Sequence, residues 1–134
     1  HRHLLSWRFA LTTLFAAVHV VHAHSYMGTA ELRIVELALG DADLVDTLVT
    51  AFSSTLPCVF VIAPLVGMLM DRFGLFASVC ALQAMALALC GLFFVPSAWA
   101  QVATFIVFTV YRSTLFALIV ALHVALYGWR SWAR

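Results

Sequence analysis

Residues 67–74 read Gly-Met-Leu-Met-Asp-Arg-Phe-Gly and separate two long apolar stretches of this 134-residue chain. The run contains an adjacent acid and base, and a glycine stands at each of its ends. Glycine adopts backbone conformations that other residues avoid, so the run favours a tight turn. The whole chain is 65% hydrophobic and 10% charged, against about 45–50% and about 25% in soluble domains. We therefore predict an all-α integral membrane protein with this turn between two membrane helices.

Four stretches of the chain are long and apolar enough to cross a bilayer. A membrane-crossing helix needs about 20 mostly apolar residues. The four transmembrane helices are predicted at about residues 4–28, 44–70, 75–95 and 99–127. After the first, an apolar pattern continues through Leu37 and should end at Gly40. Pro57 and Pro64 predict kinks in the second.

The distribution of arginine predicts how the chain lies in the membrane. Cytoplasmic loops are enriched in Lys and Arg, and acidic residues contribute little to this rule. If the start of the chain is cytoplasmic, one loop arginine, Arg33, lies outside, and the others lie on or near the cytoplasmic side: Arg2, Arg8, Arg72, Arg130 and Arg134. We therefore expect a multi-pass protein of the plasma membrane or an organelle, with both ends of this segment cytoplasmic. A net charge of +1 gives no sign of nucleic-acid binding.

Arg112 is a charged residue well inside the fourth apolar stretch. It lies about 24 Å from Gly128 at helical rise, too far to reach the interface. A charge at the centre of a bilayer costs about 2.5–3.5 kcal/mol on insertion scales. We therefore expect Arg112 to face the bundle interior or a water-filled cavity. It could line a substrate path, or it could be a structural arginine bonded to backbone carbonyls.

The first stretch carries a stripe of polar and aromatic residues on one helical face. The intervals are 3, 4, 3 and 4, which keeps them together, and the members are Thr12, Phe15, His19, His22 and Tyr26. His24 lies off the stripe. His19 has nearly the same predicted depth as Arg112, so the two helices could line a central cavity. Hydrogen bonding between packed helices is the other interpretation.

Two further sets of residues are read as packing elements. Small hydroxyl residues let helices approach closely and bond across, and the second stretch has such a face in Thr47, Thr50, Ser54 and Cys58. The three cysteines all lie in apolar runs without metal-site spacing, and we expect buried thiols that pack.

Asp71 and Arg72 in the opening run have two interpretations. In the simpler one, Arg72 sets the topology and the glycines permit the bend. In the other, Asp71 caps the next helix at its positive end and pairs with a base on another helix. Such a contact would hold one conformation of the protein and break in the other.

The run at 67–74 matches the loop signature G-x-L-x-D-R-x-G, so the chain resembles the major facilitator superfamily of transporters. Three further elements are similar to the sodium-independent large neutral amino-acid transporter subfamily. They are residues 25–31 with the later Gly40-Asp41, residues 63–67, and residues 111–117. The resemblance implies that residues 1–134 are part of the C-terminal half of a twelve-helix transporter, from its seventh to its tenth helix. The three histidines at positions 19, 22 and 24, and Glu31, depart from the subfamily pattern.

This resemblance implies transport of a small solute, a bulky neutral amino acid, by alternating access. The substrate path would include Tyr26, Met27 and Gly28 by this resemblance, and His19, His22 and Arg112 from the central cavity predicted above. The cytoplasmic gate loop would include Gly67, Asp71, Arg72 and Gly74. We expect no enzyme activity, no catalytic residue, no metal and no cofactor. The expected partners are the lipid bilayer, the small-molecule solute, and the remaining transporter helices or a partner subunit.

Two other functions are weighed against transport. Four helices are too few for the usual pathway, so the chain could be a non-transporting membrane scaffold or a truncated transporter piece. A haem-binding membrane protein needs facing histidines at equal depth. His123 lies about 7–8 Å from its helix end at helical rise, whereas His19 and His22 lie much farther into the membrane, so the haem hypothesis is the weakest.

Overall fold

The computed structural model describes residues 7–127, and this part of the chain is all-helical. The elements are α1 (Trp7–Ala38), α2 (Ala42–Thr55), the 3₁₀ turn η1 (Leu56–Cys58), α3 (Val59–Phe93) and α4 (Ala98–Tyr127). The fold class predicted from composition is therefore confirmed as all-α. The predicted helix at 4–28 extends ten residues farther, to Ala38, as the apolar pattern after Gly28 indicated.

The turn between α1 and α2 is built from backbone conformation and one helix cap. Leu39 and Gly40 have φ of +49° and +93°, which ends α1 where the sequence predicted. The Asp41 carboxylate then accepts hydrogen bonds from the backbone N–H groups of Asp43 and Leu44, both at 3.1 Å. These bonds satisfy two of the N–H groups that a helix start leaves without partners.

The predicted helix at 44–70 is one continuous path with a local change of winding. The path runs through α2, tightens into η1 at Pro57, and continues into α3. Proline cannot donate a helical hydrogen bond, which accounts for the 3₁₀ turn at that position. Pro64 lies inside α3, and the helix continues through it.

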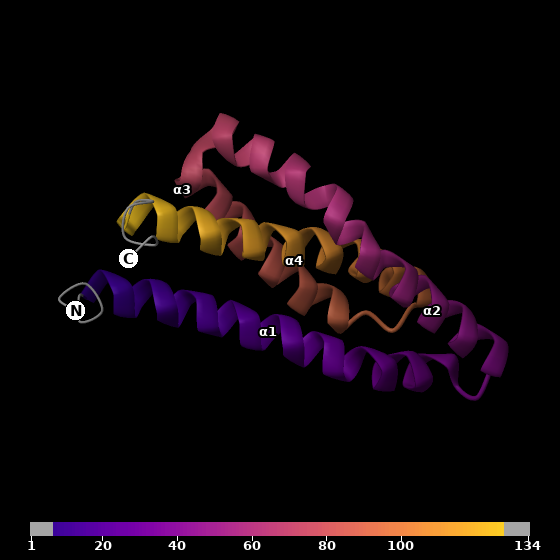
Figure 1. Cartoon of the computed structure of the whole chain (residues 1–134). Coiled ribbons are helices and arrows are strands. Elements are labelled where there is room, and N and C mark those ends of the chain that lie inside the picture. The colour runs from indigo at the N-terminus through magenta and orange to yellow at the C-terminus, as the bar shows by residue number, and fades with distance from the viewer. Residues whose placement is uncertain (1–6, 128–134) are drawn as a thin grey trace.

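Gly74 reverses the direction of α3. Its φ of +83° and ψ of 167° are non-helical and lie in a region that is essentially open to glycine alone. Figure 1 shows α3 turning back on itself near its label. We call residues 59–73 the first arm of α3 and residues 75–93 its second arm. The tight turn predicted within 67–74 is therefore confirmed. Gly74 makes it, while Gly67 lies inside the first arm.

The two ends of the bundle collect different connections. The start of α1, the reversal at Gly74 and the end of α4 lie at one end, and the α1–α2 and α3–α4 connections lie at the other (Figure 1). This arrangement is consistent with the predicted topology, in which the Gly74 turn and both ends of the segment share one side of a membrane.

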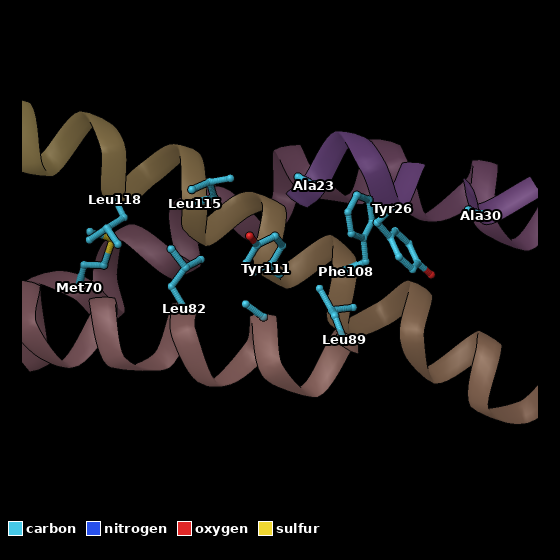
Figure 2. Packing of buried hydrophobic residues seen from close by; sticks show 11 residues of the cluster. Ala23, Tyr26, Ala30, Met70, Leu82, Leu89, Phe108, Tyr111, Leu115 and Leu118 are labelled. Carbon is cyan, nitrogen blue, oxygen red and sulfur yellow. The ribbon is translucent and has the colours of Figure 1, made fainter. Parts of the chain in front are cut away.

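Helix α4 is central, because its buried side chains meet all three other helices. Leu82 and Leu89 of the second arm point toward Phe108, Tyr111 and Leu115 of α4, as Figure 2 shows, and all five are at most 1% exposed. A second, smaller cluster joins α1, α2 and α4 through Ile34, Leu48 and Phe105. In the larger cluster, α1 contributes the small residues Ala23 and Ala30, which let α1 approach α4 closely.

Much of the apolar surface faces outward. Within residues 7–127, two stretches are long and apolar enough to cross a membrane by length and composition, namely Ala42–Phe93 and Ala98–Leu126, each with a mean hydropathy of 2.1. In the most apolar 18-residue segment of each stretch, 22% is buried inside the protein in the first stretch and 44% in the second. Large apolar side chains such as Phe60, Phe76 and Trp99 are more than four-fifths exposed. Such a surface suits a lipid environment.

The conformation of Gly74 leads to a stability prediction. Gly74→Ala places a Cβ on a backbone that L-residues rarely adopt, although the space around it is open. We expect a loss of about 1–3 kcal/mol in the free energy of unfolding. Equilibrium unfolding in mixed micelles, followed by circular dichroism, measures this change.

Gly67→Ala is the matched control. Gly67 lies inside the first arm, and a Cβ there also meets nothing within 4 Å. Alanine is the better helix former, so this variant should be more stable by about 0.5–1 kcal/mol. Equal stability of the two variants would contradict the assignment of the reversal to Gly74.

Candidate functional site

His19 and Tyr111 join α1 to α4 at the middle of the bundle. The His19 Nδ1 atom lies 2.9 Å from the Tyr111 hydroxyl oxygen, and that hydroxyl donates to the His19 carbonyl oxygen at 3.2 Å. Both bonds form together when Nδ1 carries the proton and donates it to the hydroxyl oxygen. The two side chains are 4% and 0% exposed, so this pair is fully interior.

His22 lies one helical turn from His19 but, unlike His19, has no hydrogen bond to a neighbouring helix. Its Nε2 atom is buried and has no hydrogen-bond partner. Its ring stands edge-on to Tyr111, with centroids 5.7 Å apart. An unpartnered buried polar atom costs free energy, and a native structure that keeps one usually has a use for it. His22 is therefore the residue of the α1 stripe with free binding capacity.

A cavity of about 230 Å³ adjoins His22 between α1 and the second arm of α3. Its polar or polarisable groups come from His22, Ser25, Thr29 and Cys90. The remaining lining is apolar or aromatic and consists of Tyr26, Leu89, Phe93 and Phe94. A volume of this kind suits one small molecule, and a mostly apolar lining with a few polar groups is typical of ligand pockets.

The stripe predicted on the first helix does face the interior. His19 and Tyr26 are buried, Thr12, Phe15 and His22 are half-buried, and His24 is exposed, where its ring bonds the Val20 carbonyl. The Tyr26 ring packs on Phe108 with centroids 4.5 Å apart, and its hydroxyl accepts a long bond of 3.5 Å from the Gln101 amide. Tyr26 thus both lines the cavity and anchors α1 to α4.

Met27 and Gly28, which the resemblance places in the substrate path, lie away from the cavity beside His22. Met27 is half-buried and packs at the edge of the core. Gly28 is exposed, and a Cβ built on it would meet nothing within 4 Å. Neither residue lines the cavity beside His22.

Arg112 is half-buried on α4, and its guanidinium carbon lies 5.9 Å from the centroid of the Phe116 ring. It makes no hydrogen bond or ion pair with the described residues, and it does not line the His22 cavity. The predicted match in depth with His19 holds, because His19 bonds the adjacent Tyr111. Tyr111 therefore faces α1 at that depth, and Arg112 points in another direction. A role for Arg112 in a path stays a prediction.

The predicted gate loop lies at the bundle end that carries the Gly74 reversal (Figure 1). Asp71, Arg72 and Gly74 are exposed, and Gly67 is half-buried. Arg72 stacks over Phe73, with its guanidinium carbon 5.9 Å from the ring centroid. Asp71 makes no side-chain hydrogen bond or ion pair within residues 7–127. Capping by Asp71 is therefore not seen, and its pairing with another helix stays a prediction.

The hydroxyl groups on α2 and α4 bond within their own helices. Thr104, Thr109, Ser113 and Thr114 of α4 are buried, and each donates to the carbonyl four residues earlier. They add polarity to the core without any need for a partner on another helix. The packing face expected on α2 and η1 points outward, because all four of its residues are exposed: Thr47, Thr50, Ser54 and Cys58.

The expectation of buried cysteines was wrong. Cys58, Cys80 and Cys90 are free and exposed, because the helices that carry them have only one covered side.

Within residues 7–127 no group of three or more His, Cys, Asp or Glu side chains could hold a metal ion.

Sequence reasoning missed Tyr111, Cys90 and the hydroxyls of Ser25 and Thr29 as site residues. Helix α4 is apolar on every side, so its sequence does not show which residue of the Tyr111-Arg112 pair faces α1. Ser25 follows His22 by three residues and precedes Thr29 by four, and this helical spacing could have placed both beside His22. Comparison with protein-family models, curated proteins and solved structures gives no match for this chain.

The His19–Tyr111 contact leads to a second prediction. Tyr111→Phe removes the hydroxyl that bonds both the His19 ring and the His19 carbonyl. Hydrogen bonds between membrane helices average about 0.6 kcal/mol and reach about 1.7 kcal/mol. Because two contacts are lost, we expect a destabilisation of about 1–2 kcal/mol in mixed-micelle unfolding.

The control variant is Tyr26→Phe. Its hydroxyl makes only the 3.5 Å contact with Gln101, so its loss should cost less than about 0.6 kcal/mol. If Tyr26→Phe destabilised the chain as much as Tyr111→Phe, the His19–Tyr111 pair would not be the main polar link between α1 and α4.

Proposed function

We propose that this chain is a membrane-embedded part of a transporter that moves a small solute by alternating access. The resemblance to the major facilitator superfamily, and within it to the large neutral amino-acid subfamily, suggests a bulky neutral amino acid as the solute. In this proposal the lipid bilayer surrounds the four helical passes. Further transporter helices or a partner subunit complete the pathway.

The observation that carries the proposal is the free imidazole nitrogen of His22 beside an interhelical cavity. The cavity has room for one small molecule, and its lining is mostly apolar with four polar or polarisable groups. A buried nitrogen with no partner is costly, and a transient ligand would satisfy it. Polar groups within membrane helices generally mark substrate pathways.

The reversal at Gly74 supports a mechanism in which helices move relative to one another. A single glycine in a non-helical conformation joins the two arms of α3, and the charged Asp71-Arg72 pair lies beside it. Alternating access is largely the rocking of one bundle against another around a fixed site. The exposed charges of the turn are available to helices outside this chain, as expected for a gate whose ionic contacts form in one state only.

A non-transporting scaffold is the second candidate, and one observation favours it. The buried hydroxyls of α4 bond their own helix, and the core around Phe108 and Leu115 is fully closed. Within residues 7–127 there is therefore a packed interface with separate cavities, one beside His22 and another of about 430 Å³ between α3 and α4, rather than a continuous path. A scaffold would keep the bundle stable without moving any solute.

An uptake assay separates the two candidates. In liposomes that contain the full-length transporter, His22→Ala should lower uptake of radiolabelled L-leucine by about tenfold or more, the effect of about 1.4 kcal/mol of lost binding. His24→Ala is the control, because His24 is exposed and bonds only its own helix. Uptake unchanged by His22→Ala would count against the cavity as the binding site. Absence of uptake in the unaltered protein would favour the scaffold.

Arg112 gives an independent test of the pathway. If it lines the path together with helices outside this chain, Arg112→Ala should abolish uptake in the same liposomes. Arg72→Ala, an exposed arginine on the turn, should reduce uptake without abolishing it. Full uptake by the Arg112→Ala protein would remove Arg112 from the path.

The arginine distribution predicts the side on which the chain ends. An epitope tag placed after Arg134 should be protected from antibody in intact cells and become accessible after permeabilisation. A second tag inserted at Gly40, in the turn between α1 and α2, is the control and should be accessible in intact cells. Labelling of the Arg134 tag in intact cells would reverse the topology.

A further inference from the structure

A second cavity, of about 430 Å³, lies between the two arms of α3 and helix α4. The first arm lines it through Val66, Leu69 and Phe73, and the second arm and α4 supply the remaining walls. The arms meet at the Gly74 reversal, and Phe73 is adjacent to it, so the cavity reaches this turn (Figure 1). It shares no lining residue with the cavity beside His22. We call it the inter-arm cavity.

The inter-arm cavity presents hydrocarbon to a ligand and no free hydrogen-bonding side chain. Its two hydroxyl groups belong to Ser78 and Thr114. Ser78 donates to the Gly74 carbonyl oxygen at 3.0 Å, and Thr114 donates to the Val110 carbonyl oxygen at 2.8 Å. The other lining side chains carry no nitrogen or oxygen. A polar ligand would lose its hydrogen bonds to water here without replacing them, so the cavity favours an apolar occupant.

The inter-arm cavity opens on the outer surface of the helices. Four of its lining residues are exposed, namely Leu69, Phe73, Ala77 and Ala81. In the proposed membrane location, this surface meets lipid tails. Side chains that line an empty space lose packing contacts, and a hydrocarbon chain from the surrounding lipid restores them.

The order of groups along the inter-arm cavity matches the orientation of a lipid. The lining extends from Phe73 back to Val66 on the first arm and from Ala77 to Met85 on the second. At helical rise these segments are about 10–12 Å long. The end at the turn is charged, because Asp71 and Arg72 precede Phe73, and the rest is apolar. A lipid with its headgroup at the turn can therefore place an acyl chain between the arms.

Arg72 provides a contact for the headgroup at the mouth of the inter-arm cavity. Its guanidinium carbon lies 5.9 Å from the centroid of the Phe73 ring, and Phe73 lines the cavity. Arg72 is exposed and makes no hydrogen bond or ion pair within residues 7–127. A guanidinium group matches the geometry of phosphate oxygens. Asp71 is also exposed, but Arg72 is the member of the pair that stacks on a lining residue. The charge held at the cavity is therefore positive.

We infer that the inter-arm cavity binds one acyl chain of an anionic phospholipid, whose phosphate contacts Arg72. The chain fills the space between the two arms of α3 and so supports the reversal at Gly74. The site is distinct from the solute cavity beside His22. The inference rests on the membrane location in the proposed function and is independent of transport.

Photocrosslinking locates the lipid. The full-length protein is placed in phosphatidylcholine liposomes with a trace of phosphatidylglycerol or phosphatidylcholine that carries a diazirine on its acyl chain, and mass spectrometry maps the labelled residues. At Ala77, Ala81 and Met85, phosphatidylglycerol should label about fivefold more than phosphatidylcholine, the effect of about 1 kcal/mol from one arginine near the membrane surface. Phe60 is 85% exposed and outside the cavity, so both lipids should label it equally. Equal labelling of the cavity residues by the two lipids, or none there, would overturn the inference.

Charge variants at the turn test the headgroup contact. Arg72→Gln should bring the ratio of phosphatidylglycerol to phosphatidylcholine labelling in the cavity down to about one. Asp71→Asn removes the neighbouring negative charge, so the same ratio should rise. Both residues are exposed, so neither substitution disturbs the core. A ratio that Arg72→Gln leaves unchanged would contradict the assignment of the phosphate to Arg72.

A filling variant tests the site of the acyl chain. Ala81→Phe places a ring in the cavity, so labelling at Ala77 and Met85 should fall to the background level. Ala88→Phe is the matched control, because Ala88 is exposed on the same arm and lies outside the cavity. Undiminished labelling in the Ala81→Phe protein would count against the inference. If that protein fails to fold, the Arg72→Gln ratio decides.

The lipid site and the proposed function fail in different ways. Labelling of Phe60 without labelling of the cavity would leave the membrane location in place and remove the lipid site. Labelling of neither would remove the membrane location and with it both proposals. Labelling of the cavity without any uptake of L-leucine would leave the lipid site in place and remove the transport function.

Discussion

The backbone of Gly74 is the constraint on which the rest of the bundle depends. Without a reversal at this residue, the apolar path from Ala42 to Phe93 would continue away from α4. The second arm would then not bring Leu82 and Leu89 against Phe108 and Tyr111. It would also not place Phe93 beside Arg33 or Cys90 beside His22. One glycine conformation therefore creates both the core and the cavity. A non-glycine residue could hold it only at a cost of about 1–3 kcal/mol.

Polar contacts rather than apolar burial give this bundle its specificity. In a lipid environment there is little hydrophobic drive between helices, because lipid tails are as apolar as leucine. Packing by Ala23 and Ala30 lets α1 approach α4, while the His19–Tyr111 pair and the Tyr26–Gln101 contact fix the register of the two helices. Arg33 and Phe93 do the same for α1 and α3. Tyr26 and Phe93 line the cavity beside His22 and also take part in these links, so the cavity and the contacts between helices share residues.

The sequence was sufficient for the features that depend on local chemistry. The turn at Gly74, the end of α1 at Gly40, the all-helical class and the inward stripe through His19 and Tyr26 all follow from backbone preference or helical period. The rotation of α4 could not be predicted, because a helix that is apolar on all sides has no periodic signal. The cysteines were wrongly predicted to be buried in the protein for the same reason. An apolar run shows that a side chain avoids water, but not whether protein or lipid covers it. The contacts between Arg33 and Phe93 join residues 60 positions apart, and no local pattern reports such a pair.

A comparison of Arg33 and Arg112 leads to a conclusion about what surrounds the helices. Arg33 has a carboxylate, a carbonyl and an aromatic ring as partners inside this chain. Arg112 lies at the midpoint of the candidate span Ala98–Leu126 and has only the Phe116 ring. A cation–π contact at a partly exposed site contributes about 0.5–1 kcal/mol. The insertion cost of arginine at that depth is about 2.5–3.5 kcal/mol. The ring therefore offsets less than half of the cost. In a membrane, Arg112 needs acceptors that residues 7–127 do not supply, and groups outside this part of the chain must provide them.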